Sequence, residues 1–350
     1  MASAYLSKTP ASAGNRKTFT ISVWVKRSTF AKYGRLLASY VSDTQRDESF
    51  FHETTQKFYF ESVNSSSQVC NIVTTRVFRD TAAWYHMVIA VDTTQGTAAD
   101  RVKIYVNGVQ ETAFDTSTYP SQNYDFNINN NILHYIGRSG YNSGTNSYFD
   151  GQMAHFNFVD GTALTPSSFG STDSTTGEWK PVSTPSVTYG TNGFFLKFDN
   201  SANMGLDSAG SNNLTTSGTI IQNKDTPSNV FCTMNPLDNY WQASTFANTN
   251  NTITTSAAKE NYNTSTLAMS SNDAGKYYCE VKIVSASAYS LVGLADKLTT
   301  SATSNFKNHA YGYAYDSYSG NILNNGGSSS YGNTYTTGDI IGIAVDRSTG

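Results

Sequence analysis

The chain has 350 residues, a length for which two domains are the natural expectation. Its formal net charge of -3 excludes the strong positive field that draws proteins to nucleic acid or anionic membranes. No apolar run is long enough to span a bilayer. Only 14% of the residues are charged, where about a quarter is usual, so neutral polar residues must supply the surface. Ser, Thr, Asn and Tyr favour strands and turns, and the composition predicts an all-β protein.

The N-terminal residues lack the basic stretch and apolar core of a secretory signal. Three widely spaced cysteines, Cys70, Cys232 and Cys279, form neither a disulfide framework nor a zinc pattern, and each is expected to be a small buried apolar residue. This usage fits folding in a reducing cytoplasm. The composition is typical of an extracellular protein, yet no secretory signal is present. One explanation is assembly into a virus particle inside the cell. The other is that a leader is missing from this sequence.

Alternating and apolar segments predict strands in the first half. The segment 19–25 alternates apolar and polar side chains, whereas 84–91 is nearly continuous in apolar residues and fits a strand covered on both faces. After a strand at 102–106, Asn107 and Gly108 predict a tight hairpin turn because both tolerate positive φ. Further strands are expected at 58–60, 133–136 and 149–158.

In the second half, a Ser/Thr/Pro-rich loop at 170–190 precedes a second series of strands. These strands are expected at 193–198, 214–221, 276–284, 290–295, 311–315 and 339–346. Their regular spacing, with Gly and Asn turns between them, predicts two sandwiches at 1–222 and 259–350, joined by an irregular linker at 223–258. No long amphipathic helix is predicted.

Several phrases of the first half, in this order, resemble a laminin-G-like, concanavalin-type lectin domain. They are TFTISVWVK at 18–26, WYHMVIAVD at 84–92 and VKIYVNG at 102–108. The phrase FDGQMAHF at 149–156, followed by ALT at 163–165, resembles the closing strand and short turn of that family. The resemblance implies a concanavalin-like jelly-roll sandwich.

One family phrase stands out of order. The opening strand and turn of many such domains resemble GFFLKFD at 193–199 and DSAG at 207–210, which here follow the closing strand. We therefore expect an order that resembles a circular permutation. Residues 193–221 would then form a strand pair that completes the same sandwich.

The last hundred residues resemble a SPRY domain, which is also a β-sandwich. The matching phrases are GKYYCEV at 275–281, LVGLA at 291–295, YGY at 311–313 and GDIIGIAVD at 338–346. SPRY domains continue after the last of these phrases into another strand. The resemblance therefore implies a second sandwich that is incomplete at its C-terminus, or that a partner completes.

Lectin-like and SPRY modules in tandem resemble particle-surface proteins of tailed phages from marine bacteria. The resemblance implies a tail fibre or similar appendage on the virion that binds a host surface glycan or receptor, or another virion protein. Neither nucleic acid binding nor membrane insertion is expected, and a homo-oligomer, with a trimer favoured, would add avidity. The alternatives are a structural capsid or tail decoration protein without a receptor, and a bacterial adhesin module.

No catalytic residue is predicted. Enzymes that cut glycans on concanavalin-type sandwiches need two carboxylates facing the sugar, and the sequence has no Glu-x-Asp-x-x-Glu spacing. Asp47, Glu48 and Glu53 cluster in a segment that reads as a solvated loop. His86 is expected to be a hydrogen-bonded structural residue, and no nucleophile-elbow motif supports a catalytic triad.

No metal site is predicted, although calcium binding through carboxylate and carbonyl oxygens stays an alternative. The candidate ligands are Asp92, Asp150 and Asp160. Asp92 and Asp150 are more typical of strand ends, where the side chain bonds nearby backbone amides.

Sugar binding would use aromatic faces flanked by amides and hydroxyls. The loop at 138–148 has the Gly, Ser, Asn and Tyr content of adaptable binding loops, although an ordinary polar loop has the same composition. The predicted ligand-binding residues of the first domain are Tyr124, Arg138, Tyr141, Asn142, Asn146 and Tyr148. In SPRY domains loops usually form the binding surface, and the candidates there are Asn324, Asn325 and Tyr331.

Overall fold

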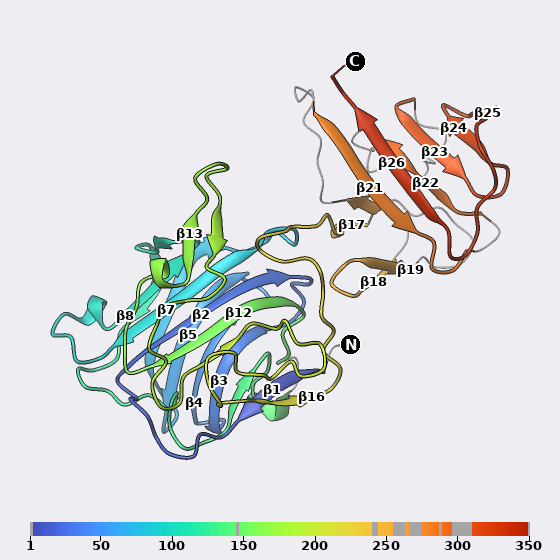
Figure 1. Cartoon of the computed structure of the whole chain (residues 1–350). Coiled ribbons are helices and arrows are strands. Elements are labelled where there is room, and N and C mark those ends of the chain that lie inside the picture. The colour runs from blue at the N-terminus through green and yellow to red at the C-terminus, as the bar shows by residue number, and fades with distance from the viewer. Residues whose placement is uncertain are drawn as a thin grey trace. The chain divides into compact units, whose positions relative to one another are not determined.

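The computed structural model describes residues 3–144, 147–239, 244–254, 263–265, 275–286, 289–295 and 310–348. The chain divides into two compact units, residues 1–231 and 232–350 (Figure 1). The first unit thus includes the first nine residues of the predicted linker at 223–258. Both units are built from strands, and the fold class predicted from the sequence is confirmed.

Two antiparallel sheets form the N-terminal unit. The larger sheet has eight strands in the order β10 (Phe114–Thr118), β6 (Ser67–Val77), β5 (Lys57–Asn64), β4 (Gln45–Phe51), β3 (Gly34–Ser42), β11 (His134–Ile136), β1 (Tyr5–Lys8) and β16 (Thr215–Ser217). The smaller has six, in the order β15 (Phe194–Leu196), β12 (Gly151–Asp160), β2 (Thr18–Arg27), β7 (Tyr85–Asp92), β8 (Val102–Val106) and β9 (Val109–Gln110). A short hairpin of β13 (Gly170–Thr172) and β14 (Trp179–Pro181) projects from the unit (Figure 1).

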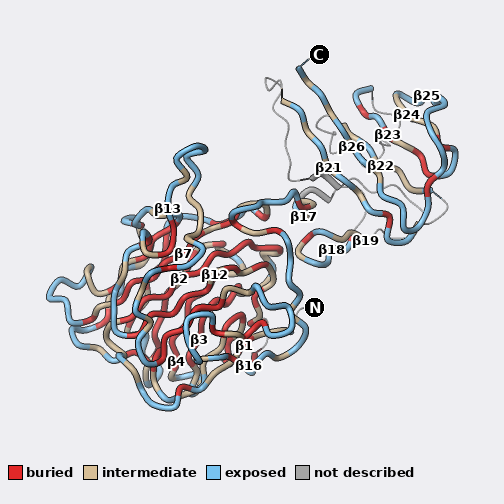
Figure 2. The backbone as a smooth tube through the Cα atoms, in the orientation of Figure 1, coloured by how far each residue is buried: buried red, intermediate tan, exposed pale blue. Residues whose placement is uncertain are grey.

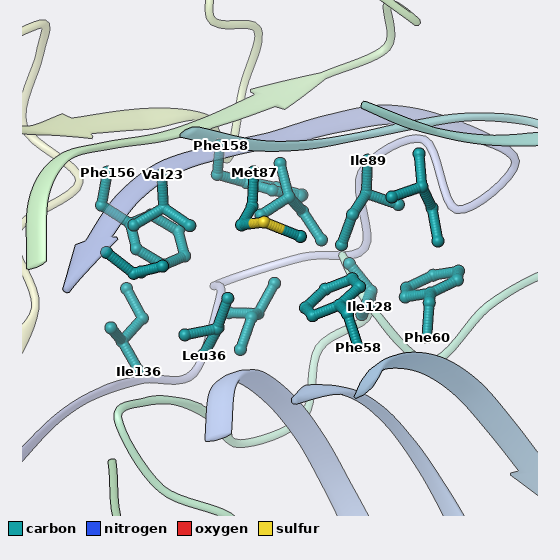
Figure 3. Close-up of a cluster of buried hydrophobic side chains, with 14 of the residues drawn as sticks. Val23, Leu36, Phe58, Phe60, Met87, Ile89, Ile128, Ile136, Phe156 and Phe158 are labelled. Carbon is teal, nitrogen blue, oxygen red and sulfur yellow. The ribbon is translucent and has the colours of Figure 1, made fainter. Parts of the chain in front are cut away.

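The core lies between these two sheets because each strand places alternate side chains on its inner face. Figure 3 shows Val23, Met87, Ile89, Phe156 and Phe158 of the six-stranded sheet facing Leu36, Phe58, Phe60 and Ile136 of the eight-stranded sheet, with Ile128 between them. All of these side chains are buried. The buried strands run through the middle of the unit, and exposure is concentrated in its loops (Figure 2).

The segment after residue 190 adds one strand to each sheet. β15 pairs with β12, where Phe195 lies opposite Asn157. β16 pairs with β1, where Thr216 lies opposite Leu6. β15 and β16 therefore belong to the sandwich that begins at the N-terminus, but they do not pair with each other as the predicted strand pair would.

The tight hairpin at Asn107 and Gly108 forms between β8 and β9, with φ of 49° and 84° at the two residues. The interpretation of Asp47 and Glu48 as part of a solvated loop is wrong. Both lie in β4 and are fully buried. The charged composition of this segment suggested exposure to solvent. In the folded sheet, arginines rather than water compensate the charge of Glu48.

The C-terminal unit contains four small antiparallel sheets among the described residues. Three of them have two strands each: β17 (Met234–Asn239) with β20 (Asn263–Ser265), β18 (Thr245–Ala247) with β19 (Thr252–Thr254), and β21 (Lys276–Lys282) with β26 (Ile340–Asp346). The fourth sheet has four strands, β22 (Leu291–Ala295), β23 (Gly312–Asp316), β24 (Asn321–Asn324) and β25 (Gly327–Ser330). The hydroxyl of Tyr335 donates to the carbonyls of Ser290 and Tyr315 at 2.6 and 2.9 Å, and ties the end of this fourth sheet to the segment before β26.

Helices are confined to short 3-10 turns at Ala98–Asp100 and Pro166–Ser168 in the described part of the chain, and Tyr141–Gly144 is a turn with non-helical backbone angles. None of the described helices combines the length and apolarity needed to cross a membrane. Of the three free cysteines, Cys70 is buried, Cys279 is half-buried and Cys232 is exposed. The expectation of burial is therefore wrong for Cys232.

Candidate functional site

The two outer faces of the N-terminal sandwich differ in what covers them. Behind the six-stranded sheet, the segment 162–190 packs Leu164, Val187 and Tyr189 against a second buried cluster. That cluster contains Val88, Ala90, Tyr105, Val159 and Phe169. The hydroxyl of Tyr189 also donates to Asn157 Oδ1 at 2.7 Å. The chain thus covers this face with its own residues.

His86 is held on the same covered face. The indole N–H of Trp179 donates to Nδ1 of His86 at 2.9 Å, and the imidazole stacks on Trp24 with ring centroids 4.6 Å apart. Because Nδ1 accepts this bond, the ring proton lies on Nε2, which donates to the hydroxyl of Ser22 at 2.9 Å. Burial lowers the pKa of His86 to about 3. This neutral, doubly bonded histidine is structural, in agreement with the expectation from the sequence.

Asp225 fastens the last segment of the unit to this side of the sandwich. Its carboxylate accepts bonds from Lys26 Nζ at 2.8 Å and from the indole N–H of Trp84 at 3.1 Å. The backbone N–H of Phe231 donates to the same carboxylate at 3.1 Å. The side chains of Lys26 and Asp225 are only 2% and 1% exposed. This buried ion pair explains why residues 223–231 belong to the first unit rather than to a linker.

The eight-stranded sheet presents a different outer face. Its register places Tyr135 opposite Ala38, Ala38 opposite Glu48, and Glu48 opposite Glu61, so these side chains form one row on one face. We call this surface the aromatic face. Its tyrosines and arginines are Tyr5, Tyr33, Tyr59, Tyr135, Tyr141, Tyr148, Arg35, Arg46 and Arg138, and every one of these tyrosines is at least partly exposed.

Two glutamates and two arginines form a network at the centre of the aromatic face. Glu48 Oε2 lies 2.5 Å from Arg35 NH1 and 3.1 Å from Arg46 Nε. Arg46 NH2 reaches Glu61 Oε1 at 3.3 Å, and Gln68 Nε2 donates to the other oxygen of Glu61 at 3.1 Å. Paired carboxylates are therefore present, contrary to the sequence-based expectation of no such pair, although they belong to neighbouring strands rather than to one.

The network shifts the ionisation of Glu61. Burial raises the pKa of Glu61 above its usual range, and the negative charge of Glu48 raises it further. Arg35 and Arg46 in turn stack on rings: the Arg35 guanidinium lies 4.0 Å from the Phe50 ring centroid. The Arg46 guanidinium lies 3.9 Å from the ring centroid of Tyr141. Both arginines of this network thus have a glutamate partner within the protein.

A second group of rings surrounds Arg138. Its guanidinium carbon lies 4.8 Å from the ring centroid of Tyr5 and 5.3 Å from those of Tyr135 and Tyr148. A hydrogen bond to Ser217 is the main factor that lowers the pKa of Tyr5, and the positive charge of Arg138 contributes. This group places two of the predicted binding residues, Arg138 and Tyr148, beside two tyrosines from β1 and β11.

The loop that follows Arg138 folds over the sheet in an unusual backbone conformation. Asn142, Ser143 and Gly144 have consecutive positive φ values of 50°, 56° and 76°. The backbone N–H of Asn142 donates to Asp43 Oδ1 at 3.1 Å, which anchors the loop to the end of β3. Tyr141 and Asn142 therefore lie at the aromatic face as well, and Asn146 lies outside the described residues.

The remaining predicted binding residues lie elsewhere. Tyr124 packs against the core, and its hydroxyl lies 3.0 Å from that of Ser62 on the inner side of β5. In the C-terminal unit, Asn324 Nδ2 donates to the carbonyls of Ala310 and Gly312 at 3.1 and 2.7 Å. Asn325 has a φ of 48° in the turn between β24 and β25, and Tyr331 just after β25 is 67% exposed.

The three calcium candidates do not converge. Asp92 ends β7 and accepts bonds from the backbone N–H and hydroxyl of Thr94, and these bonds lower its pKa. Asp160 accepts bonds from the backbone N–H of Asn15 and from the side-chain amide of Asn129. The backbone carbonyl of Asp150 accepts from the N–H of Ser28. Among the described residues, no three His, Cys, Asp or Glu side chains form a group that could hold a metal.

The predicted binding residues include only three members of the aromatic face, Arg138, Tyr141 and Tyr148, and leave out the other six. Tyr5, Tyr33, Tyr59 and Tyr135 lie in or beside strands whose partners become known only from the register. One usable signal was the alternation of charged and aromatic residues in 46–50, which places Arg46, Glu48 and Phe50 on one face of a strand.

Residues 2–168 match a laminin G family model described as the concanavalin A-like lectin/glucanases superfamily. The N-terminal unit therefore contains a concanavalin A-like lectin/glucanase domain. β15 and β16 lie beyond the matched residues, yet they belong to the same two sheets. No curated protein matches the sequence.

Solved structures also resemble the chain. A candidate carbohydrate-binding protein from Bacteroides ovatus is 20% identical with a TM-score of 0.44, over 65% of this chain and 59% of that one. A SAP-like pentraxin from Limulus polyphemus is 15% identical with a TM-score of 0.34, over 46% and 71%. Domain 4 of the arabinanase AbnA from Geobacillus stearothermophilus, solved with arabinotriose, is 19% identical with a TM-score of 0.33, over 44% and 65%.

Proposed function

We propose, on the premise of a concanavalin A-like lectin/glucanase domain at 2–168, that this protein binds glycans through the aromatic face without cleaving them. The observation that carries the proposal is the band of partly exposed tyrosines that crosses the sheet from β5 to β1. Four strand spacings of about 4.8 Å make this band about 19 Å wide, which accommodates several sugar rings. Aromatic faces beside charged and amide groups are the usual means of holding sugars.

The central carboxylates support binding rather than hydrolysis. Hydrolysis requires one carboxyl to donate a proton to the glycosidic oxygen while the other faces the sugar carbon or a water. Here Glu48 is fully buried, and Arg35 and Arg46 both engage one of its oxygens. A carboxylate held in this way fixes the arginines under the rings. Release of reducing sugar by the purified protein would overturn this part of the proposal.

The biological setting we propose is the surface of a phage particle, as a tail fibre or similar appendage that attaches to the host. Its support is the tandem of a lectin-like domain with the SPRY-like phrases of the C-terminal unit, including GKYYCEV, which overlaps β21, and GDIIGIAVD, which overlaps β26. Homo-oligomers, with a trimer favoured, would present many weak sites together. Particles that lack the protein should lose adsorption to their host, whereas unchanged adsorption favours a decoration role.

A glycan array probed with the purified full-length protein tests the site. Tyr148→Ala should weaken binding by about two- to tenfold, the range expected for one aromatic contact. Tyr331→Ala, a matched variant of an exposed tyrosine in the C-terminal unit, should leave binding unchanged. If Tyr331→Ala alone reduced binding, the site would be the hairpin of β24 and β25.

A further inference from the structure

Arg138 differs from the other arginines of the aromatic face in its charge balance. Arg35 and Arg46 contact Glu48 or Glu61 within 3.3 Å. Arg138 has no carboxylate within ion-pair distance in the part of the chain that the structure describes. Its charge is therefore uncompensated by an acid, although the face around it offers partly exposed rings.

The guanidinium of Arg138 is held in place by its surroundings, which include a hydrogen bond with the side chain of Tyr5. Its Nε is buried and has no acceptor among the described residues. Three tyrosine rings and the backbone of Gly144 fix the guanidinium, and a Cβ at Gly144 would lie 2.8 Å from its NH2 atom. A guanidinium fixed between rings loses little freedom when an anion binds, and its planar fork matches the two oxygens of a carboxylate or sulfate.

We propose that Arg138, together with Tyr5, Tyr135 and Tyr148, forms a subsite for a negatively charged sugar, one that carries a carboxylate or a sulfate. The guanidinium pairs with the anionic group, while the rings contact the apolar side of the pyranose. This inference rests on the proposed function, because it names the chemical class of glycan that the aromatic face selects. Arg35 and Arg46, which are already paired with Glu48 and Glu61, contribute no such selection.

An array of matched oligosaccharides tests the subsite with the full-length protein. The probes are oligogalacturonate, its neutral methyl ester, a sulfated galactan fragment and the same fragment after desulfation. We expect stronger binding to a charged probe than to its neutral partner, and a decrease of that preference as salt is raised. The pair that shows the preference identifies the anion as carboxylate or sulfate.

Variants separate a binding role from a structural one. Arg138→Gln should lower affinity for the charged probe by about tenfold or more, the loss expected for a charge-assisted bond, and should lower affinity for the neutral probe by a smaller factor because the guanidinium also positions the rings. Arg138→Lys should restore part of the loss because it keeps the charge but not the fork. Arg79→Gln removes an exposed arginine from the loop before β7 and is the matched control for net charge. Circular dichroism and thermal melting establish that each variant is folded.

The outcomes distinguish the two proposals. Equal binding to charged and neutral probes, unchanged in Arg138→Gln, overturns the subsite and leaves glycan binding by the aromatic face intact. A charge preference that Arg138→Gln and Arg79→Gln reduce equally also overturns the subsite, since it reports overall charge. Absence of binding to all four probes and to a broad glycan array overturns both proposals.

Discussion

The two outer faces of the N-terminal sandwich bury charge in different ways. Behind the six-stranded sheet, returning segments of the chain cover the strands, and the Lys26–Asp225 pair lies at the end of the last one. On the eight-stranded sheet the arginines and glutamates lie within the aromatic face itself, under partly exposed tyrosines. Covering by the chain removes a face from solvent, whereas a network of side chains leaves rings accessible to a ligand.

The difference explains where binding is expected. A strand face that its own chain covers needs polar groups only to hold the covering segment, as Trp179 and Asp225 do. A face without such a cover must remain compatible with water, and charged and aromatic side chains meet that need. The rigid strands beneath then fix these side chains in place, which favours recognition.

Asp225→Ala, on the covered face, should cause the largest loss of unfolding free energy. The variant leaves the buried ammonium of Lys26 and the indole N–H of Trp84 without the carboxylate. We expect the free energy of unfolding to fall by about 3–5 kcal/mol, as is usual when one member of a buried pair is removed. Denaturant unfolding of the N-terminal unit measures this loss. Asp115→Ala breaks the more exposed Lys57–Asp115 pair and should cost less than about 1 kcal/mol; equal losses would mean that the covering segment is not held by its ion pair.

The buried carboxyl of Asp47, on the eight-stranded sheet, should make the free energy of unfolding depend on pH. Asp47 points inward, accepts bonds from Ser62 and the backbone N–H of Ile128, and burial raises its pKa to about 6. Because the folded pKa exceeds the unfolded value of about 3.9, stability is highest below that value and is lost as pH rises to about 6. The loss should approach about 3 kcal/mol at pH 7. Asp47→Asn, compared with wild type across pH 4–7, should be flatter; parallel curves would contradict the shift.

His86 on the six-stranded sheet should respond in the opposite direction. Its folded pKa of about 3 lies below the unfolded value of about 6.5, so the neutral ring stabilises the fold above pH 6.5. That contribution is lost as pH falls, and reaches about 2 kcal/mol by pH 5. His86→Gln should lose less stability than wild type between pH 7 and 5, measured by the same unfolding assay. An unchanged difference between the two proteins across that range would mean that the imidazole does not titrate on unfolding.

The fold could be predicted from the sequence wherever apolar periodicity was clear. The segments 19–25 and 102–106 alternate, 84–91 is nearly continuous in apolar residues, and each became a strand of the six-stranded sheet. The segment 45–51 was misread because Arg46, Asp47 and Glu48 are polar in composition, although their burial depends on partners in neighbouring strands. Sequence alone cannot supply such partners, because register is a property of the folded sheet.

The candidate site could be predicted only in its loop. Gly, Ser, Asn and Tyr at 138–148 drew attention to Arg138, Tyr141 and Tyr148, and all three lie at the aromatic face. Tyr5 and Tyr135 come from β1 and β11, which meet only because the chain closes the sheet in this order. The same limit explains Tyr124, whose side chain lies on the core side of the sheet. The composition of a loop is enough to single out binding residues within it. Rings that lie on strands can be grouped into a site only when the order of the strands is known.

Removal of one tyrosine hydroxyl from each face should have the smallest effect on the free energy of unfolding, and it compares the two faces directly. Tyr189→Phe removes a hydroxyl that donates to Asn157 Oδ1 on the covered face, and should cost about 1 kcal/mol of unfolding free energy. Tyr148→Phe makes the same change on the aromatic face, at a partly exposed ring beside Arg138, and should stay within about 0.5 kcal/mol of wild type. Denaturant unfolding of both variants under one buffer condition measures the pair. If Tyr148→Phe cost as much as Tyr189→Phe, the hydroxyl of Tyr148 would serve the fold, and the rings around Arg138 would be packing rather than a surface available to sugars.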